Sequence, residues 1–262
     1  MKNNPIGIFD SGVGGTSIWK EINTMLPDES TIYLADSKNA PYGAKKPKEI
    51  LRLSIKNTEL LLKMGCKLIV VACNTATTNA IHHLRENYDV PFIGIEPAIK
   101  PAALKSNSKK VGVLATKGTL SSALFHKTSN DHASGITIIE MEGAGLVPLI
   151  EAGKIDSKET KELLDKILQP MLKEEIDYLV LGCTHYPYLM EALRELLPKH
   201  IQVIDSGEAV ARQTKAILEK NGILRIKGEE ATYQFYSNGN ASVLRSLLGI
   251  TGKNVSIDSL DF

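Results

Sequence analysis

The feature that most constrains the fold is an internal repeat of two strand-like segments. Residues 66–73 (CKLIVVAC) align without a gap with residues 176–183 (IDYLVLGC), at an offset of 183 − 73 = 110. Residues 6–11 (IGIFDS) align with residues 111–116 (VGVLAT), at an offset of 111 − 6 = 105. Short matches between buried strands can arise by chance, but two matches in the same order at nearly the same offset favour an architecture that is built twice. Each half then has a first strand that contains a glycine and a later strand that ends in a cysteine.

Short apolar runs alternate with longer amphipathic segments along the whole chain. One helix is predicted from Pro47 to a stop at Gly65, and another from Ser157 to about Lys173. The predicted strands are Ile6–Phe9, Thr31–Ala35, Leu68–Ala72, Phe92–Ile95, Val111–Leu114, Ile136–Met141, Tyr178–Gly182, Val203–Ile204 and Thr232–Tyr236. This alternation predicts an α/β fold of two pseudo-symmetric lobes, each a mainly parallel sheet flanked by helices. Ligands of such sheets gather at the carboxyl ends of the strands, so the active site is expected in the cleft between the lobes.

Two short segments are candidates for the crossings between the lobes. Residues 96–98 (EPA) and 205–207 (DSG) each follow a predicted strand, at comparable places after the cysteines at 73 and 183. The first lobe is therefore predicted to comprise residues 1–97 plus 207–262, and the second lobe residues 98–206.

Composition and charge narrow the class of protein. The chain has 31 Lys and Arg against 30 Asp and Glu, a balance that gives no electrostatic case for a nucleic-acid or membrane partner. Its longest apolar runs are strand-sized, far short of a membrane span, and no secretory signal precedes the first strand. Three cysteines, an odd number, fit a reducing compartment better than a disulfide framework. We therefore expect a cytoplasmic location and no membrane or nucleic-acid partner.

The two cysteines that end strands have polar neighbours. Cys73 is followed by Asn74 and Thr75 at an expected helix start, where backbone N–H groups stabilise an anion. Cys183 is followed by Thr184 and by His185, which can give or take a proton near neutral pH. A cysteine at the end of a buried strand is by default a packed apolar residue. The matching contexts in the two halves favour a functional interpretation.

Two equivalent thiols that face each other suit the inversion of a Cα centre. One cysteine removes a proton from one face as a thiolate, and its partner supplies a proton to the other face as a thiol. A free thiol has a pKa of about 8.5, so neighbouring groups must tune it, and Asp10 and His185 are the candidates. Cys66 precedes its strand, has no polar neighbours and is expected to pack.

Other chemistries fit the sequence less well. The spacing of Cys66 and Cys73 and the adjacent pair His82 and His83 do not match zinc sites, and a Cys-x-x-Cys redox motif is absent. A Cys/His hydrolase would need no second cysteine in a matching context. No metal is therefore expected, and an enzyme that works through two thiols is expected to need no cofactor.

The glycine-rich loop at residues 10–16 (DSGVGGT) leaves one alternative of another class open. It can cradle a carboxylate or phosphate, and it partly matches a dinucleotide-binding fingerprint, with Asp36 as the acid after the next strand. A nucleotide-binding oxidoreductase is thus an alternative, although it leaves both cysteines unexplained. The Walker pattern is absent.

Four motifs together carry a resemblance to a known family. Residues 9–15 (FDSGVGG), 41–43 (PYG), 72–77 (ACNTAT) and 182–187 (GCTHYP) resemble the glutamate racemases of the aspartate/glutamate racemase superfamily, in the family's order along nearly the whole chain. The resemblance implies two α/β lobes, no pyridoxal phosphate, no metal, and interconversion of L- and D-glutamate, with D-glutamate supplied for peptidoglycan synthesis. It also implies an enzyme that is often a homodimer. Aspartate racemase is the nearest alternative, but its second motif usually carries Glu where this chain has His185.

The resemblance also implies roles for individual residues. Cys73 would take the proton from the D-isomer and Cys183 from the L-isomer, flanked by Asp10 and His185. The implied substrate-binding residues are Asp10, Ser11, Tyr42, Gly43, Asn74, Thr75, Thr184 and His185. Two further candidates are Thr116, the counterpart of Ser11 in the second half, and Glu151, an acid that resembles one near the family's second cysteine.

Overall fold

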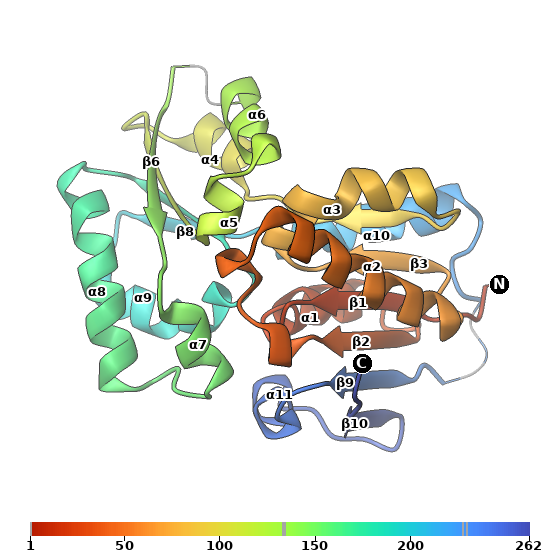
Figure 1. Ribbon diagram of the computed structural model, residues 1–262. Helices are drawn as coiled ribbons and strands as arrows, with labels where there is room; N and C mark the ends of the chain where they lie inside the picture. Colours follow the sequence, from red (N-terminus) through yellow and green to blue (C-terminus); the bar gives the residue numbers. More distant parts are fainter. Residues whose placement is uncertain (1, 133–134, 227, 229) are drawn as a thin grey trace.

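The computed structural model describes residues 2–132, 135–226, 228 and 230–262, and these residues build two parallel sheets (Figure 1). A six-stranded sheet has the order β10-β9-β2-β1-β3-β4, and a four-stranded sheet has the order β6-β5-β7-β8. The first sheet contains β1 (Ile6–Asp10), β2 (Thr31–Ala35), β3 (Leu68–Val71), β4 (Phe92–Gly94), β9 (Tyr233–Ser237) and β10 (Val255–Ser259). The second contains β5 (Lys110–Ala115), β6 (Thr137–Glu142), β7 (Tyr178–Gly182) and β8 (Gln202–Ile204). We call the two sheets with their helices the first and the second lobe.

Helices cover both faces of each sheet. In the first lobe these are α1 (Thr16–Met25), α2 (Pro47–Lys63), α3 (Asn74–Asn87), α10 (Gly207–Lys220), α11 (Ala241–Leu248) and the short turns η1 (Ser37–Asn39) and η2 (Tyr42–Ala44). In the second lobe they are α4 (Ile99–Lys105), α5 (Lys117–Leu120), α6 (Ala123–His132), α7 (Leu146–Glu151), α8 (Lys158–Lys173), α9 (Met190–Leu196) and η3 (Tyr186–Leu189). Helices α1 and α10 share one apolar core with the first sheet, while α2 and α3 share another (Figure 1). Among the described residues, no helix is both long and apolar enough to cross a membrane.

The second sheet repeats the topology of the first. The order β2-β1-β3-β4 recurs as β6-β5-β7-β8. The register recurs as well, because Ile6 pairs with Leu68 in one sheet and Val111 pairs with Tyr178 in the other. The offsets between these pairs, 111 − 6 = 105 and 178 − 68 = 110, are those of the sequence repeat. The predicted fold class is confirmed.

A glycine in the first strand of each lobe explains why the repeat is visible in the sequence. A Cβ at Gly7 would lie 2.9 Å from the Sγ atom of Cys66, and a Cβ at Gly112 would lie 2.8 Å from the Cδ1 atom of Ile176. Gly7 therefore makes room for the residue two positions before β3, and Gly112 for the residue two positions before β7. Cys66 is the counterpart of Ile176 (176 − 66 = 110) and fills the same place as an apolar side chain.

The nine predicted strands are present, with each end within one residue of its expected position. The strand β10 was not predicted, because its sequence VSIDS is half polar and it forms the partly exposed edge of the sheet. The helix predicted from Pro47 ends at Lys63, before Gly65, whose φ of +83° suits glycine. The other predicted helix, α8, begins after its N-cap residue Ser157.

The chain passes between the sheets after β4 and again after β8. The two crossings touch, because the hydroxyl group of Ser206 donates a hydrogen bond to the carbonyl oxygen of Glu96. The strands β9 and β10, which follow the second crossing, lie in the first sheet. The exact lobe boundaries, residues 1–97 plus 207–262 and residues 98–206, stay a prediction.

Candidate active site

A small cavity lies where the carboxyl ends of strands from both sheets face each other. It is lined by Ser11, Pro41, Tyr42, Gly43, Cys73, Asn74, Thr75, Thr116, Val147, Gly182, Cys183, Thr184 and His185. Every cavity-facing residue named from the sequence is in this set, and the two others, Asp10 and Glu151, contact His185. The cavity volume is about 10 Å³, room for about one water molecule. A substrate therefore has to separate the lobes to reach it.

Cys73 is placed by the junction of β3 and α3. It is the N-cap residue of α3, and its Sγ atom accepts a hydrogen bond from the backbone N–H of Ala76 at 3.4 Å. Burial nevertheless raises the pKa of the Cys73 thiol well above its usual value, and the nearby carboxylate of Asp10 adds to this, whereas the Ala76 N–H acts in the opposite direction. In this conformation burial favours the protonated thiol form of Cys73.

Cys183 occupies the equivalent place after β7 but has a different neighbour. Its Sγ atom lies 3.8 Å from Nδ1 of His185. Burial lowers the pKa of His185, but contacts with Cys183 and Glu151 outweigh burial and hold this pKa well above its usual value. The raised pKa favours the charged form of the ring beside the Cys183 sulfur, whereas the largest influences on the pKa of Cys73 include no cation.

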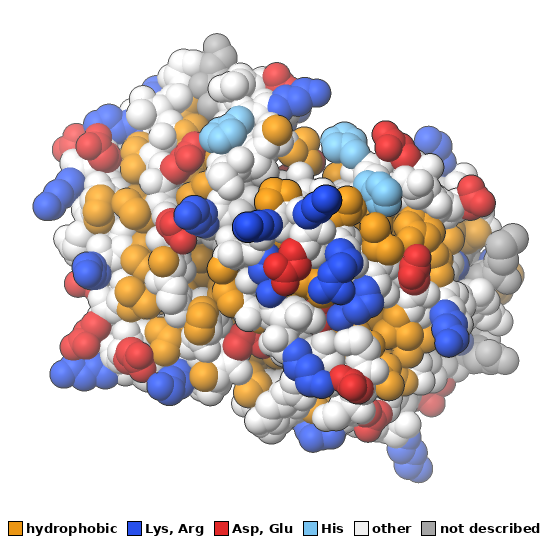
Figure 2. All heavy atoms as spheres, in the orientation of Figure 1, with side chains coloured by type: hydrophobic (Ala, Val, Ile, Leu, Met, Phe, Trp, Pro, Cys, Tyr) orange, Lys and Arg blue, Asp and Glu red, His pale blue; other side chains and the backbone are white. Residues whose placement is uncertain are grey.

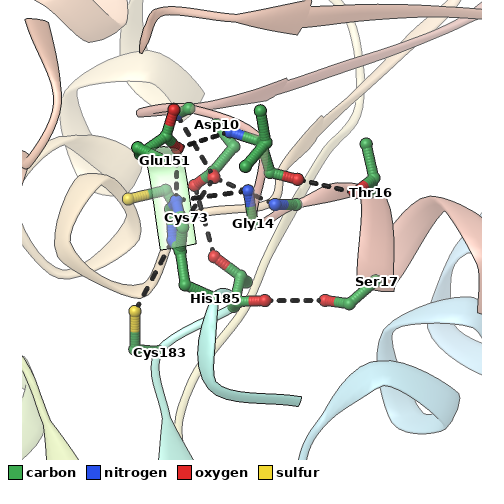
Figure 3. A network of polar contacts seen from close by, with 12 residues as sticks. Asp10, Gly14, Thr16, Ser17, Cys73, Glu151, Cys183 and His185 are labelled. Atoms are coloured by element: carbon green, nitrogen blue, oxygen red, sulfur yellow. Dashed lines mark hydrogen bonds and ion pairs between the residues drawn. The ribbon is translucent and has the colours of Figure 1, made fainter. Parts of the chain in front are cut away.

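Glu151, at the end of α7, holds the other side of the ring (Figure 3). Its Oε1 atom lies 2.6 Å from Nε2 of His185 and also accepts a hydrogen bond from the N–H of Val13 at 2.7 Å. Its Oε2 atom accepts a hydrogen bond from the hydroxyl group of Ser37 at 2.8 Å. Val13 and Ser37 belong to the first lobe, so Glu151 orients the histidine and joins the lobes. Sequence reasoning missed Ser37, because nothing local marks a contact between residues 114 positions apart.

Asp10 ends β1 and is fully buried under the glycine loop. Its Oδ2 atom accepts hydrogen bonds from the N–H groups of Gly15 at 2.9 Å and Gly12 at 3.3 Å. Its Oδ1 atom accepts one from the hydroxyl group of Thr184 at 3.4 Å, and Oδ2 lies 4.0 Å from Nδ1 of His185. Burial raises the pKa of Asp10, while His185 and the backbone N–H groups partly offset this.

The glycine loop cradles a carboxylate, as its sequence suggested, but the carboxylates are those of Asp10 and Glu151. A Cβ at Gly12 would lie 1.8 Å from Oε1 of Glu151, and one at Gly14 would lie 2.2 Å from Nδ1 of His185. These glycines therefore admit side chains of the second lobe. The loop N–H groups that a phosphate would need are already bonded, those of Gly12 and Gly15 to Asp10 and that of Val13 to Glu151. The geometry does not support the nucleotide-binding alternative.

Asp36, the acid of that alternative, is also engaged. Its Oδ2 atom accepts a hydrogen bond from the hydroxyl group of Tyr42 at 2.5 Å, and its Oδ1 atom accepts from the side chains of Asn39, Lys56 and Asn238. The carboxylate fixes Tyr42, which lines the cavity beside Gly43.

Hydroxyl and amide groups line the rest of the cavity. The Oγ1 atoms of Thr75 and Thr116 lie 2.7 Å apart across the lobes, and Oγ1 of Thr119 lies 3.2 Å and 3.1 Å from them. Asn74 is buried, and neither its side-chain nitrogen nor its oxygen has a hydrogen-bond partner among the described residues. Thr119 and Val147 were not expected from the sequence, whereas Thr116 was named as the counterpart of Ser11.

No three His, Cys, Asp or Glu side chains within the described ranges are grouped so that they could hold a metal ion. The chemistry available from these residues is proton transfer. Two thiols at equivalent positions in facing lobes, one of them beside an imidazolium, are typical of an isomerase that removes a proton from one face of a carbon and supplies one to the other.

Comparison with known proteins identifies this class of isomerase. Residues 6–214 match the model of the Asp/Glu/Hydantoin racemase family, and the chain belongs to this family. It is therefore an amino-acid racemase.

Glutamate racemases are prominent among its relatives. The chain is 46% identical over 244 residues to a glutamate racemase of Ralstonia pickettii, an alignment that covers 93% of this chain and 86% of the relative. A crystal structure of Escherichia coli glutamate racemase in complex with L-glutamate and the activator UDP-MurNAc-ala superposes with a TM-score of 0.86, 35% identity and coverage of 98% of both chains. An aspartate racemase of Picrophilus torridus, 20% identical over 84% of this chain and 94% of its own, superposes with a TM-score of 0.57 and shares the fold.

Proposed function

We propose that the protein interconverts L-glutamate and D-glutamate through Cys73 and Cys183, without a cofactor. The observation that carries the proposal is the pairing of these two thiols at equivalent ends of β3 and β7, on one cavity. The relatives named above support glutamate as the substrate.

In the proposed reaction each thiol serves one face of Cα. With L-glutamate, Cys183 removes the α-proton as a thiolate, and Cys73 delivers its own proton to the opposite face. With D-glutamate, Cys73 acts as the base and Cys183 as the acid. His185 stabilises negative charge on the Cys183 sulfur from 3.8 Å, and Asp10 lies between the two halves of the site.

The substrate is held by hydrogen bonds in this proposal. Asn74 offers an unpartnered amide to a carboxylate, and the hydroxyl groups of Ser11, Thr75, Thr116 and Thr184 line the same cavity. Each bond is worth about 1 kcal/mol net, so several together fix Cα between the thiols. Tyr42 and Gly43 complete the wall.

The experiment that tests the proposal follows solvent deuterium. Purified protein is incubated in D₂O with L-glutamate, and in parallel with L-aspartate, without added cofactor. We expect D-glutamate labelled at Cα. Product without deuterium at Cα would contradict proton abstraction, and turnover of aspartate alone would assign the protein to the aspartate racemases.

The proposal extends to the metabolic role, the location and the oligomeric state of the enzyme. The enzyme would supply D-glutamate for peptidoglycan synthesis, as its resemblance to glutamate racemases implies. It would work in the cytoplasm, a location that suits three free and buried cysteines. It would be a homodimer. The molar mass of the purified protein, measured by light scattering during size-exclusion chromatography, tests this directly.

A further inference from the structure

A second, larger pocket adjoins the catalytic cavity. Its volume is about 290 Å³, compared with about 10 Å³ for the cavity. The two share Pro41, Gly43, Thr116 and Val147 as lining residues, so these residues lie between them. We call the larger pocket the vestibule.

The wall between the vestibule and the cavity includes a contact between the two lobes. Thr116 of the second lobe lines both spaces and is held to Thr75 of the first lobe by the 2.7 Å contact between their hydroxyl groups. Gly43 packs so closely that a Cβ there would lie 2.6 Å from the Cβ of Thr116. Separation of the lobes at this contact joins the vestibule to the cavity.

Another part of the cavity wall, at Thr184 and His185, is tied to the first lobe more firmly. The hydroxyl group of Ser17 donates to the carbonyl oxygen of Thr184 at 2.9 Å, and the hydroxyl groups of Thr16 and Tyr188 lie 2.5 Å apart. His185 and Glu151 pack against the glycine loop on this side. The side bounded by Thr116 has fewer bonds to break.

The vestibule carries one group of each charge. Lys117 and Glu142 line it, both are exposed, and no ion pair joins them or engages either one within the described residues. The rest of the lining is glycine, alanine, proline, valine and threonine. On the face shown in Figure 2, Lys and Arg side chains gather over the middle of the molecule, where the lobes meet in the same view of Figure 1.

We propose that the vestibule is an outer binding site for the acidic amino-acid substrate, in which Lys117 binds a carboxylate before the substrate passes Thr116 into the cavity. Glu142 would face the substrate ammonium group. The proposal rests on the proposed function, and it adds a substrate-binding residue outside the cavity. Because Lys117 lies outside the cavity, it acts on substrate binding and leaves the proton transfers unchanged.

Steady-state kinetics in both directions test this role. The variants are Lys117→Gln, Lys117→Glu and the conservative Lys117→Arg, and Lys199→Glu is the matched control, an exposed lysine of the same lobe away from the vestibule. At low ionic strength we expect KM for both enantiomers to rise about threefold in Lys117→Gln and about tenfold in Lys117→Glu, with kcat within about twofold of the wild type. Lys117→Arg and Lys199→Glu should keep the wild-type KM. Added salt should shrink the differences, because the Debye length falls from about 30 Å at 0.01 M to about 8 Å at 0.15 M.

The outcomes separate the two proposals. A wild type that does not racemise glutamate overturns the proposed function. If the wild type racemises glutamate but Lys117→Glu keeps its KM, or lowers kcat alone, the vestibule proposal is wrong. An equal rise of KM in Lys199→Glu would attribute the effect to net charge and would also overturn it.

Discussion

The Nε2 atom of His185 lies 2.6 Å from the Oε1 atom of Glu151, and the same carboxylate accepts a hydrogen bond from Val13 in the opposite lobe. The charge state of the histidine beside Cys183 is thus linked to the closed arrangement of the lobes. Loss of the proton from His185, or of the charge from Glu151, weakens the contact between these two residues and the closed arrangement of the lobes at once.

The first prediction concerns pH. Replacement Glu151→Gln removes one of the contacts that raise the pKa of His185, so the alkaline limb of the kcat profile should move to lower pH. The exposed pair Lys154 and Glu159 provides the control, because Glu159→Gln leaves the site untouched. An unchanged alkaline limb in Glu151→Gln would show that Glu151 does not support the charged ring.

The same contact predicts how stability depends on pH. Because the folded-state pKa of His185 is raised, its stabilisation is fully present below its unfolded value of about 6.5 and is lost as pH rises through the folded-state pKa. Urea unfolding should therefore show the largest advantage of the wild type over Glu151→Gln at the acid end of this window. A difference in the free energy of unfolding between the wild type and Glu151→Gln that grows with pH would contradict this prediction.

The second prediction separates the three cysteines. Cys73→Ser and Cys183→Ser should each lower kcat by about 10² to 10⁴-fold, because a serine hydroxyl is a much weaker acid than a thiol and its anion, the form that would act as the base, is hardly populated. Cys66→Ser should keep the wild-type kcat. Cys66 packs against Gly7 as its counterpart Ile176 packs against Gly112, and burial raises the pKa of Cys66 to about 12. Racemisation rates of the three variants in both directions measure this, and near-normal turnover by either of the first two would rule out the two-thiol scheme.

The third prediction concerns the close approach of the lobes. Gly14→Ala places a Cβ 2.2 Å from Nδ1 of His185, so the ring or the loop must move. Displacement of a catalytic group by about 1 Å costs on the order of 10²-fold in rate. Gly228→Ala is the control, because no atom of the described residues lies within 4 Å of a Cβ at Gly228. Equal kcat values for the two variants would show that the loop accommodates a methyl group at position 14 without displacing His185.

The fourth prediction concerns the hydroxyl contact between Thr75 and Thr116. A double-mutant cycle with Thr75→Val and Thr116→Val should give a coupling of about 1 kcal/mol in the free energy of unfolding. Thr24→Val paired with Thr116→Val should be additive, because Thr24 bonds only within its own helix among the described contacts. Additivity in both cycles would show that the contact between Thr75 and Thr116 does not stabilise the folded protein.

The parts of the fold and site that the sequence predicts are those written locally. Alternating apolar runs predict the strands. The repeated glycines are visible in the sequence because Gly7 and Gly112 each make room for one packed residue. Cys73 and Cys183 stand out because their polar neighbours follow them directly in the chain.

The remaining features depend on contacts between distant segments. Ser37 meets Glu151, and Thr119 meets Thr75, only after the lobes assemble. The protonation of Cys73 depends on how deeply it is buried, which its neighbours in sequence do not reveal. The glycine loop, expected to cradle a carboxylate or a phosphate, binds the carboxylates of Asp10 and Glu151.

The repeated register of the two sheets has a consequence for kinetics. The repeat places Cys73 and Cys183 at equivalent strand ends, yet among the described contacts the His185 ring lies beside Cys183 alone. Mirror-image substrates have the same free energy in water, so thermodynamics requires kcat/KM to be equal in the two directions whatever the protein does. The unequal surroundings of the sulfurs can therefore appear only as compensating differences in kcat and KM, and in which enantiomer predominates on the enzyme at equilibrium.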